Sequence, residues 1–161
     1  AITAILILCL GAGVAETAIR IAPNVASADS PILSATMDAH AIGRIVRAAG
    51  VTGPIVSLTP ERVADSGIRL DPRFAAGPFL FRTRNLLTPA QRAAFHVLNG
   101  DSVVEGLTRH PPAAIVTGQE SAPSPASPHG LESPLIAWAK AQGYSATTLP
   151  SGAVTLYLQR E

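Results

Sequence analysis

The chain has 161 residues, enough for one domain with a single hydrophobic core. Hydrophobic residues make up 47% of it and charged residues only 14%, with the apolar excess concentrated at the N-terminus. The formal net charge is +1 and the basic residues form no run, so charge gives no indication of a nucleic-acid partner. The single cysteine, Cys9, excludes a fold held together by internal disulfides.

The first apolar stretch predicts a membrane segment. Residues 1–15 carry no charged side chain, and Glu16 is the first. A membrane-spanning helix needs roughly 20 apolar residues, so residues 1–21 are predicted to be the C-terminal part of such a helix. Residues 22–35 are rich in Pro, Ser and Ala, which is typical of a linker. A soluble domain is then expected over residues 36–161.

Two other interpretations of this stretch remain open. Residues 26–28 (Ala-Ser-Ala) have the small-x-small form of a signal-peptide cleavage site, although no basic region precedes the apolar run. Alternatively, residues 4–10 are a buried strand and residues 11–13 (Gly-Ala-Gly) begin a phosphate-binding loop. The third glycine of that motif would fall at Glu16, whose carboxylate would repel phosphate.

A helix, a strand and a short helix are predicted next. The helix is capped at Ser34 or Thr36 and ended by Gly50. Its apolar stripe comprises Met37, Ala41, Ile42, Ile45, Val46 and Ala49, and its solvated face comprises Asp38, His40, Arg44 and Arg47. Residues 55–58 (Ile-Val-Ser-Leu) form a short, mostly apolar run that is typical of a buried strand. Thr59-Pro60-Glu61 has the pattern of a helix start.

The second half of the chain contains further helix and strand signals. An irregular segment, 68–86, precedes a helix from Thr88 to about Leu98 with a capping-box pattern. Asp101 is predicted to cap the following helix, which presents Val103, Val104 and Leu107. The remaining elements are a buried strand over 113–117, a mobile loop over 118–130, a helix from Ser133 to Gly143, and a hairpin of 144–149 and 153–159 with one buried face.

This order of elements predicts an α/β fold. Strands separated by helices imply a parallel pair joined by a right-handed crossover, and the last hairpin adds an antiparallel strand. The expected architecture is a small Rossmann-like sandwich of two or three layers. It has about four strands and a C-terminal β-hairpin, and an apolar transmembrane helix precedes it.

The polar residues form no recognisable catalytic or metal-binding motif. The histidines have no ligand spacing and no cysteine joins them, so no metal site is predicted at His40, His96, His110 and His129. The chain has no G-x-S-x-G nucleophile elbow, and its carboxylates are sparse. The sequence therefore predicts no catalytic residue and no cofactor.

Residues 71–82 are the most unusual stretch, because they hold three of the four Phe residues together with two Arg. One interpretation is a packed irregular connection whose Phe side chains complete the core. The other is a surface that docks on a membrane domain or borders a lipid-linked or polymeric substrate, with exposed Phe beside Arg suited to anionic headgroups. The candidate interface residues are Asp71, Arg73, Phe74, Gly77, Phe79 and Arg82.

A family resemblance rests on four segments in order. These are GPIVSLTP (53–60), IRLDPRFAAGPFLFR (68–82), HPPAAIVTG (110–118) and ESPLIAWAKAQGY (132–144). Together with the apolar start, they resemble the C-terminal region of bacterial polytopic membrane glycosyltransferases of the protein mannosyltransferase and aminoarabinose transferase superfamily. The resemblance covers the whole chain, but none of the four segments is a catalytic signature.

The resemblance implies a role as the extracytoplasmic C-terminal domain of an enzyme that transfers a sugar from a polyprenyl-phosphate donor. The family's catalytic acid lies far upstream, so no catalytic residue is implied here and this domain would be accessory. The implied partners are the upstream membrane domain, the lipid-linked donor and the membrane, and the implied location is the periplasmic side of the inner membrane. The alternatives are a membrane-anchored or secreted interaction module, and a small nucleotide-binding enzyme.

Overall fold

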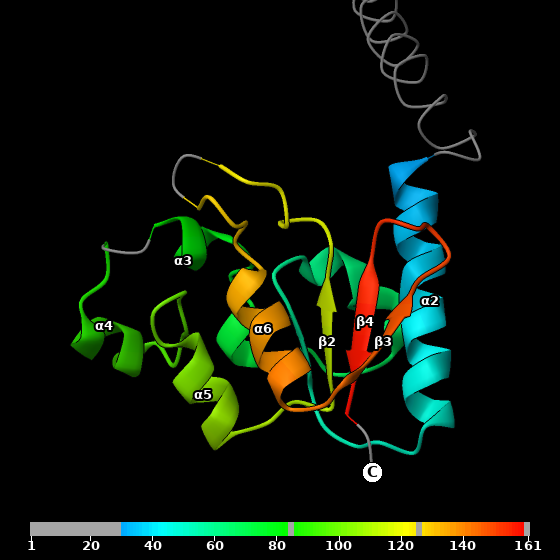
Figure 1. Cartoon of the computed structure of the whole chain (residues 1–161), viewed down its shortest axis with the longest axis horizontal. Coiled ribbons are helices and arrows are strands. Elements are labelled where there is room, and N and C mark those ends of the chain that lie inside the picture. The colour runs from blue at the N-terminus through cyan, green and yellow to red at the C-terminus, as the bar shows by residue number, and fades with distance from the viewer. Residues whose placement is uncertain (1–29, 84–85, 125–126, 160–161) are drawn as a thin grey trace, which may run out of the picture.

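A computed structural model describes residues 30–83, 86–124 and 127–159, which form a four-stranded mixed sheet with flanking helices (Figure 1). The strands are β1 (Ile55–Ser57), β2 (Ala114–Thr117), β3 (Ser145–Thr148) and β4 (Thr155–Leu158), in the order β1-β2-β4-β3. β1 and β2 are parallel, and β4 runs antiparallel to both β2 and β3. The predicted α/β class, parallel pair and C-terminal hairpin are confirmed.

Helices cover both faces of the sheet because alternate strand residues point to opposite sides. Ile55 packs in one core cluster with Ile42 of α2 (Pro31–Ala48). Val56 packs in the other cluster with Leu107 of α5 (Val103–Arg109) and Leu135 of α6 (Ser133–Ala141). The molecule therefore has three layers.

The prediction that the hairpin has one buried face is wrong for β4. Leu156 and Tyr157, which point to opposite faces, are both buried. Leu156 packs in the core cluster under α2, and Tyr157 packs in the cluster under α5 and α6, so both faces of β4 are covered. β3 is the edge strand, and most of its side chains are exposed.

The first described helix starts earlier than predicted. Ser30 is the N-cap of α2, and its Oγ accepts the Leu33 N–H at 3.4 Å, with Pro31 at the first helical position. Residues 31–35 of the predicted linker are thus helical. The predicted membrane segment, 1–21, lies outside the described residues, as do its two alternative interpretations. Within the described ranges, no helix combines the length and hydropathy needed to cross a bilayer.

The buried face of α2 also differs from the predicted stripe. Asp38, expected in solvent, is completely buried, whereas Met37, expected in the core, is 51% exposed. The residues that α2 buries are Asp38, Ala39, Ala41, Ile42, Gly43 and Val46. Gly43 permits close packing, because a Cβ there would collide with the carbonyl oxygen of Ser66. The helix is rotated toward a neighbouring turn.

A buried ion pair explains this rotation. Arg62 Nη1 donates to Asp38 Oδ2 at 3.1 Å and to Ser34 Oγ at 3.2 Å. The Ser151 N–H, in the turn between β3 and β4, donates to Asp38 Oδ1 at 3.1 Å. Buried charges are tolerated when they are paired and hydrogen-bonded, and both carboxylate oxygens have partners here. One carboxylate therefore joins α2 to the helical turn η1 (Pro60–Arg62) and to the hairpin.

The segment between β1 and β2 contains short helical pieces. After η1 come η2 (Ala64–Ser66), η3 (Pro72–Phe74), α3 (Phe79–Arg82) and α4 (Pro89–Ala94). The capping box at Thr88 and Gln91 is confirmed, but α4 ends at Ala94 rather than near Leu98. His96 follows in a left-handed conformation (φ 53°) that breaks the helix.

The start of α5 differs in detail from the prediction. Its N-cap is Ser102, not Asp101, and the Asn99 side chain accepts the N–H groups of both residues. Val103 and Leu107 are buried as expected, but Val104 is 49% exposed. The helix starts one residue later than predicted and buries only the stripe of Val103, Gly106 and Leu107. Val104 therefore lies on the side of the helix that faces solvent.

Asp38→Ala is expected to lower the free energy of unfolding by about 3–5 kcal/mol, because it leaves the Arg62 guanidinium buried without its counter-charge. Urea unfolding of the purified chain, followed by the fluorescence of its sole tryptophan, Trp138, measures the change. Asp65→Ala on η2 removes an exposed carboxylate and is the control, with an expected change within about 0.5 kcal/mol. Equal effects of the two substitutions would contradict the structural role of the pair.

Candidate functional site

Two of the six candidate interface residues anchor a helix. Asp71 is buried, and its carboxylate accepts hydrogen bonds from Arg73 Nη2 at 2.6 Å, from Arg73 Nε at 3.0 Å and from the Arg73 backbone N–H at 3.0 Å. The Arg73 guanidinium also donates to the carbonyl oxygens of Gly106 (2.8 Å) and His110 (3.1 Å) at the end of α5. A cation at this position interacts favourably with the carbonyl groups at the C-terminal end of the helix. This pair is therefore engaged in holding η3 against α5.

Two more candidates are packed inside the protein. Phe74 is 1% exposed and stacks on Phe81 with ring centroids 6.1 Å apart. Gly77 has a positive φ of 57°, and a Cβ there would come within 3.0 Å of the Leu58 carbonyl oxygen. These positions fit the interpretation of a packed irregular connection.

Phe79 and Arg82, both on α3, are the candidates that reach the surface. Phe79 is 68% exposed. The Arg82 side chain is 52% exposed, and its Nη2 donates to both Glu120 oxygens at 2.6 and 2.7 Å. An exposed pair of this kind contributes at most about 1 kcal/mol. Its geometric effect is to attach α3 to the loop that follows β2.

Glu132, which the sequence pattern did not single out, holds that loop. It is completely buried at the start of α6. Its Oε2 accepts the Gly118 N–H at 2.7 Å and the Ser121 hydroxyl at 2.6 Å, whereas Oε1 has no hydrogen-bond partner among the described residues. In the sequence, Glu132 resembles an ordinary acid before a helix start. Only the position of the loop shows that it is buried.

Burial raises the pKa of the Glu132 carboxyl, although hydrogen bonds from Ser121 and Gly118 oppose the change. Burial also raises the pKa of Tyr157, and the Glu132 charge adds to the effect. Buried carboxyls with a raised pKa often serve as catalytic acids or bases. Glu132 has no exposed surface, so the geometry supports a role in positioning the loop.

The surface has two notable hollows. One, of about 470 Å³, lies where α2 begins, next to η1 and η2, and is lined by Pro31, Ile32, Ala35, Thr36, Glu61, Arg62, Asp65 and Gln119. The other, of about 190 Å³, lies at the start of α6. It is lined by Phe81, Gly100, Ser127, Pro128, His129, Gly130, Leu131, Ser133 and Pro134. The second hollow contains two serines and His129, but no hydrogen bond joins the imidazole to either hydroxyl in the described part of the chain.

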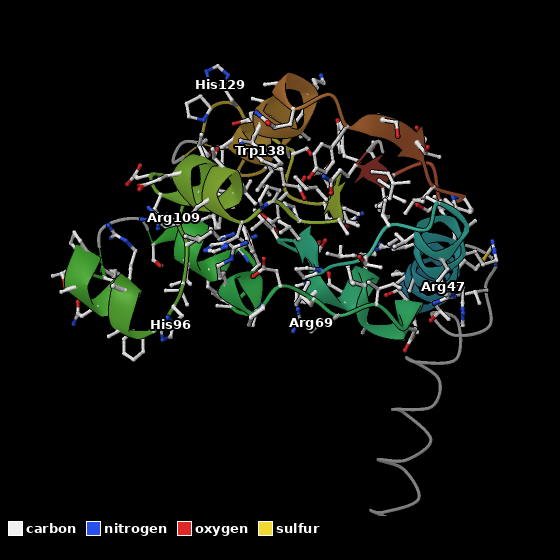
Figure 2. The ribbon with its side chains drawn as sticks, turned by 90° about the horizontal axis from the view of Figure 1, so that it is seen from below. Arg47, Arg69, His96, Arg109, His129 and Trp138 are labelled. Carbon is white, nitrogen blue, oxygen red and sulfur yellow. The ribbon has the colours of Figure 1, made fainter. Side chains whose placement is uncertain are left out.

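The four histidines come from four different segments of the fold: α2, the turn after α4, the end of α5 and the loop before α6. His96 and His129 lie at opposite edges of the molecule (Figure 2). Among the residues that the structure describes, no three His, Cys, Asp or Glu side chains are grouped so that they could hold a metal ion. At the end of β1, where α/β proteins often bind ligands, the Ser57 hydroxyl is buried and accepts the Thr59 N–H at 3.0 Å.

Comparison with known proteins adds no relative. No family model, no curated protein and no solved structure matches the chain. The geometry above and the sequence resemblance are therefore the basis for a functional proposal.

Glu132→Gln should change the pH dependence of stability. Because burial raises the folded-state pKa, the folded protein retains this proton to a higher pH than the unfolded chain. The wild type is expected to lose free energy of unfolding relative to E132Q as pH rises from the ordinary pKa of 4.5 through the raised pKa of the folded state.

Urea unfolding at a series of pH values above and below 4.5 gives the difference between the two proteins. Glu61→Gln, which removes an exposed carboxylate from η1, is the matched control. Parallel profiles for the wild type and E132Q would contradict the assigned effect of burial on the carboxyl.

Proposed function

We propose that this chain is the extracytoplasmic C-terminal domain of a membrane glycosyltransferase that transfers a sugar from a polyprenyl-phosphate donor. In this proposal the domain is accessory, and the catalytic residues lie upstream of residue 1. The support from sequence is the ordered set of segments over 53–60, 68–82, 110–118 and 132–144. The four-stranded mixed sheet between helices is compatible with a Rossmann-like sandwich, which we propose as its architecture.

The observation that carries the proposal is the apolar surface at the beginning of α2. Ile32, Leu33 and Met37 are 63%, 43% and 51% exposed. Such patches commonly mark a surface that contacts another protein or a membrane. These residues come soon after the predicted membrane segment, 1–21, so a bilayer or an upstream membrane domain would lie close enough to cover them. We propose that the segment spans the inner membrane and that the domain lies on its periplasmic side.

The same edge of the domain carries α3. In Figure 1, one edge of the molecule carries three features: the start of α2, the carboxyl end of β2, and α3. The exposed Phe79 on α3 adds to the apolar surface there. Ligands of α/β sheets bind beyond the carboxyl ends of the strands, so this edge is the one we propose to face the membrane domain and the lipid-linked donor. Nucleic acid has no part in this proposal.

The alternative is a membrane-anchored or secreted interaction module without enzymatic activity. It would use the same exposed apolar surface at the beginning of α2, where Ile32, Leu33 and Met37 are exposed, to bind its partner. The two functions differ in one measurable property. Only the glycosyltransferase proposal requires that the full-length protein transfers sugar and that substitutions on α3 change this activity.

Phe79→Glu in the full-length protein is expected to lower sugar transfer about tenfold, equivalent to about 1.4 kcal/mol, because it places a charge in the proposed apolar contact. Arg82→Ala, which detaches α3 from Glu120, should have a smaller effect. The assay measures transfer of labelled sugar from a polyprenyl-phosphate donor in isolated membranes. Thr147→Glu on the exposed edge strand β3 is the control. Unchanged transfer and expression in both α3 variants would leave α3 with a packing role only.

The proposed location can be tested by labelling. With Cys9 replaced by Ser, Thr147→Cys provides one exposed thiol. A membrane-impermeant maleimide is expected to label it in intact spheroplasts, since the thiol would face the periplasm. Ile115→Cys, completely buried in β2, should stay unlabelled in the folded protein. Labelling of T147C only after lysis would place the domain on the cytoplasmic side instead.

A further inference from the structure

The segment 86–98, here called the α4 arm, is preformed although it has little contact with the core. Helix α4 buries none of its residues, and Figure 1 shows it at one extreme of the molecule. The side chains beside it are unusually apolar for such a position: Leu86 is 76% and Phe95 is 64% exposed. Short helices are marginal in water unless they pack on other structure, so this one needs another source of order.

Local hydrogen bonds supply that order. The Thr88 hydroxyl accepts the Gln91 N–H at 3.3 Å, and Gln91 Oε1 accepts the Thr88 N–H at 2.9 Å. Arg92 Nη1 donates to the Leu87 carbonyl oxygen at 2.6 Å. The arm therefore presents Leu86 and Phe95 from a preformed helix, which lowers the entropy cost of binding through them.

The charge of the arm indicates what covers it. The α4 arm itself contains Arg92 and no Asp or Glu, and the stretch before it, 72–85, adds Arg73, Arg82 and Arg84 and also lacks acidic residues. Arg73 and Arg82 are paired with carboxylates, as described above. Arg92 forms no ion pair with a carboxylate in the described part of the chain, so its charge is not neutralised. The arm thus combines exposed Phe and Leu side chains with uncompensated positive charge.

We propose that the α4 arm binds the surface of a bilayer that contains anionic lipids. Phe95 and Leu86 enter the boundary between headgroups and acyl chains, and Arg92 contacts lipid phosphate. Arginine suits this position because its guanidinium binds phosphate while its stem covers apolar surface. This inference rests on one part of the proposed function, which is that the domain lies next to a membrane.

Fluorescence quenching by lipid tests this contact. The full chain, with Cys9 replaced by Ser, carries Phe95→Cys labelled with an environment-sensitive dye. It is reconstituted into vesicles that contain nitroxide-labelled lipid in phosphatidylcholine, with or without phosphatidylglycerol. Thr147→Cys on β3, which lies far from α4 in Figure 1, carries the same dye as the control. Trp138 emission checks that each variant is folded, because that side chain is 5% exposed in the core.

The label at position 95 is expected to be quenched about twofold more than the control in phosphatidylglycerol vesicles. That excess should disappear in phosphatidylcholine alone, with Arg92→Glu, or at 1 M salt, where the screening length is about 3 Å. Equal quenching at the two positions would overturn the proposal. So would an excess that does not depend on lipid charge, which would indicate apolar contact with the bilayer and no recognition of anionic lipid by Arg92. Either negative result leaves the sugar-transfer assay, and with it the proposed function, unaffected.

Discussion

The burial of Asp38 against Arg62 is the constraint on which the arrangement of the described domain depends. The carboxylate comes from α2, the guanidinium from η1 and a third partner, the Ser151 N–H, from the hairpin turn. Removing any one of them would leave a buried polar group without a partner, which costs more than the pair itself contributes. The orientation of α2 is therefore set by a polar contact as well as by its apolar stripe. The rotation that buries Asp38 also places Met37 in solvent, so the core contact and the exposed apolar surface have one cause.

A second buried carboxylate organises the opposite half of the molecule. Glu132, at the start of α6, binds the loop after β2 through Gly118 and Ser121. The same loop provides Glu120, which holds Arg82 and thereby α3. A continuous set of contacts thus connects the buried carboxyl to the surface that carries Phe79. Since the carboxyl is buried with one oxygen unpartnered, it costs stability in its charged form while it specifies the position of the loop.

The functional proposals concern the side chains that these contacts leave exposed on the surface. In the stretch 71–82, the core takes Phe74, and Asp71 and Arg73 hold α5. What remains outside is Phe79 with Arg82, and further along the chain the α4 arm with Phe95. Exposed apolar groups next to arginine have a clear physical use at a membrane surface, where headgroups bind the cation and the acyl boundary accepts the ring. The same groups have no comparable use in bulk water.

Local patterns in the sequence alone determined the class of the fold and the kinds of its elements. The apolar runs at 55–58 and 113–117, the capping box at Thr88 and the alternating hairpin depend on neighbouring residues, so they can be read without a tertiary structure. The burial of Asp38 could not be read in this way, because its partners lie 24 and 113 positions away. Periodicity assigns a charged residue to solvent by default, and only a distant counter-charge reverses that assignment. For the same reason, only the tertiary structure decided which Phe residues of 71–82 enter the core and which remain to meet another surface.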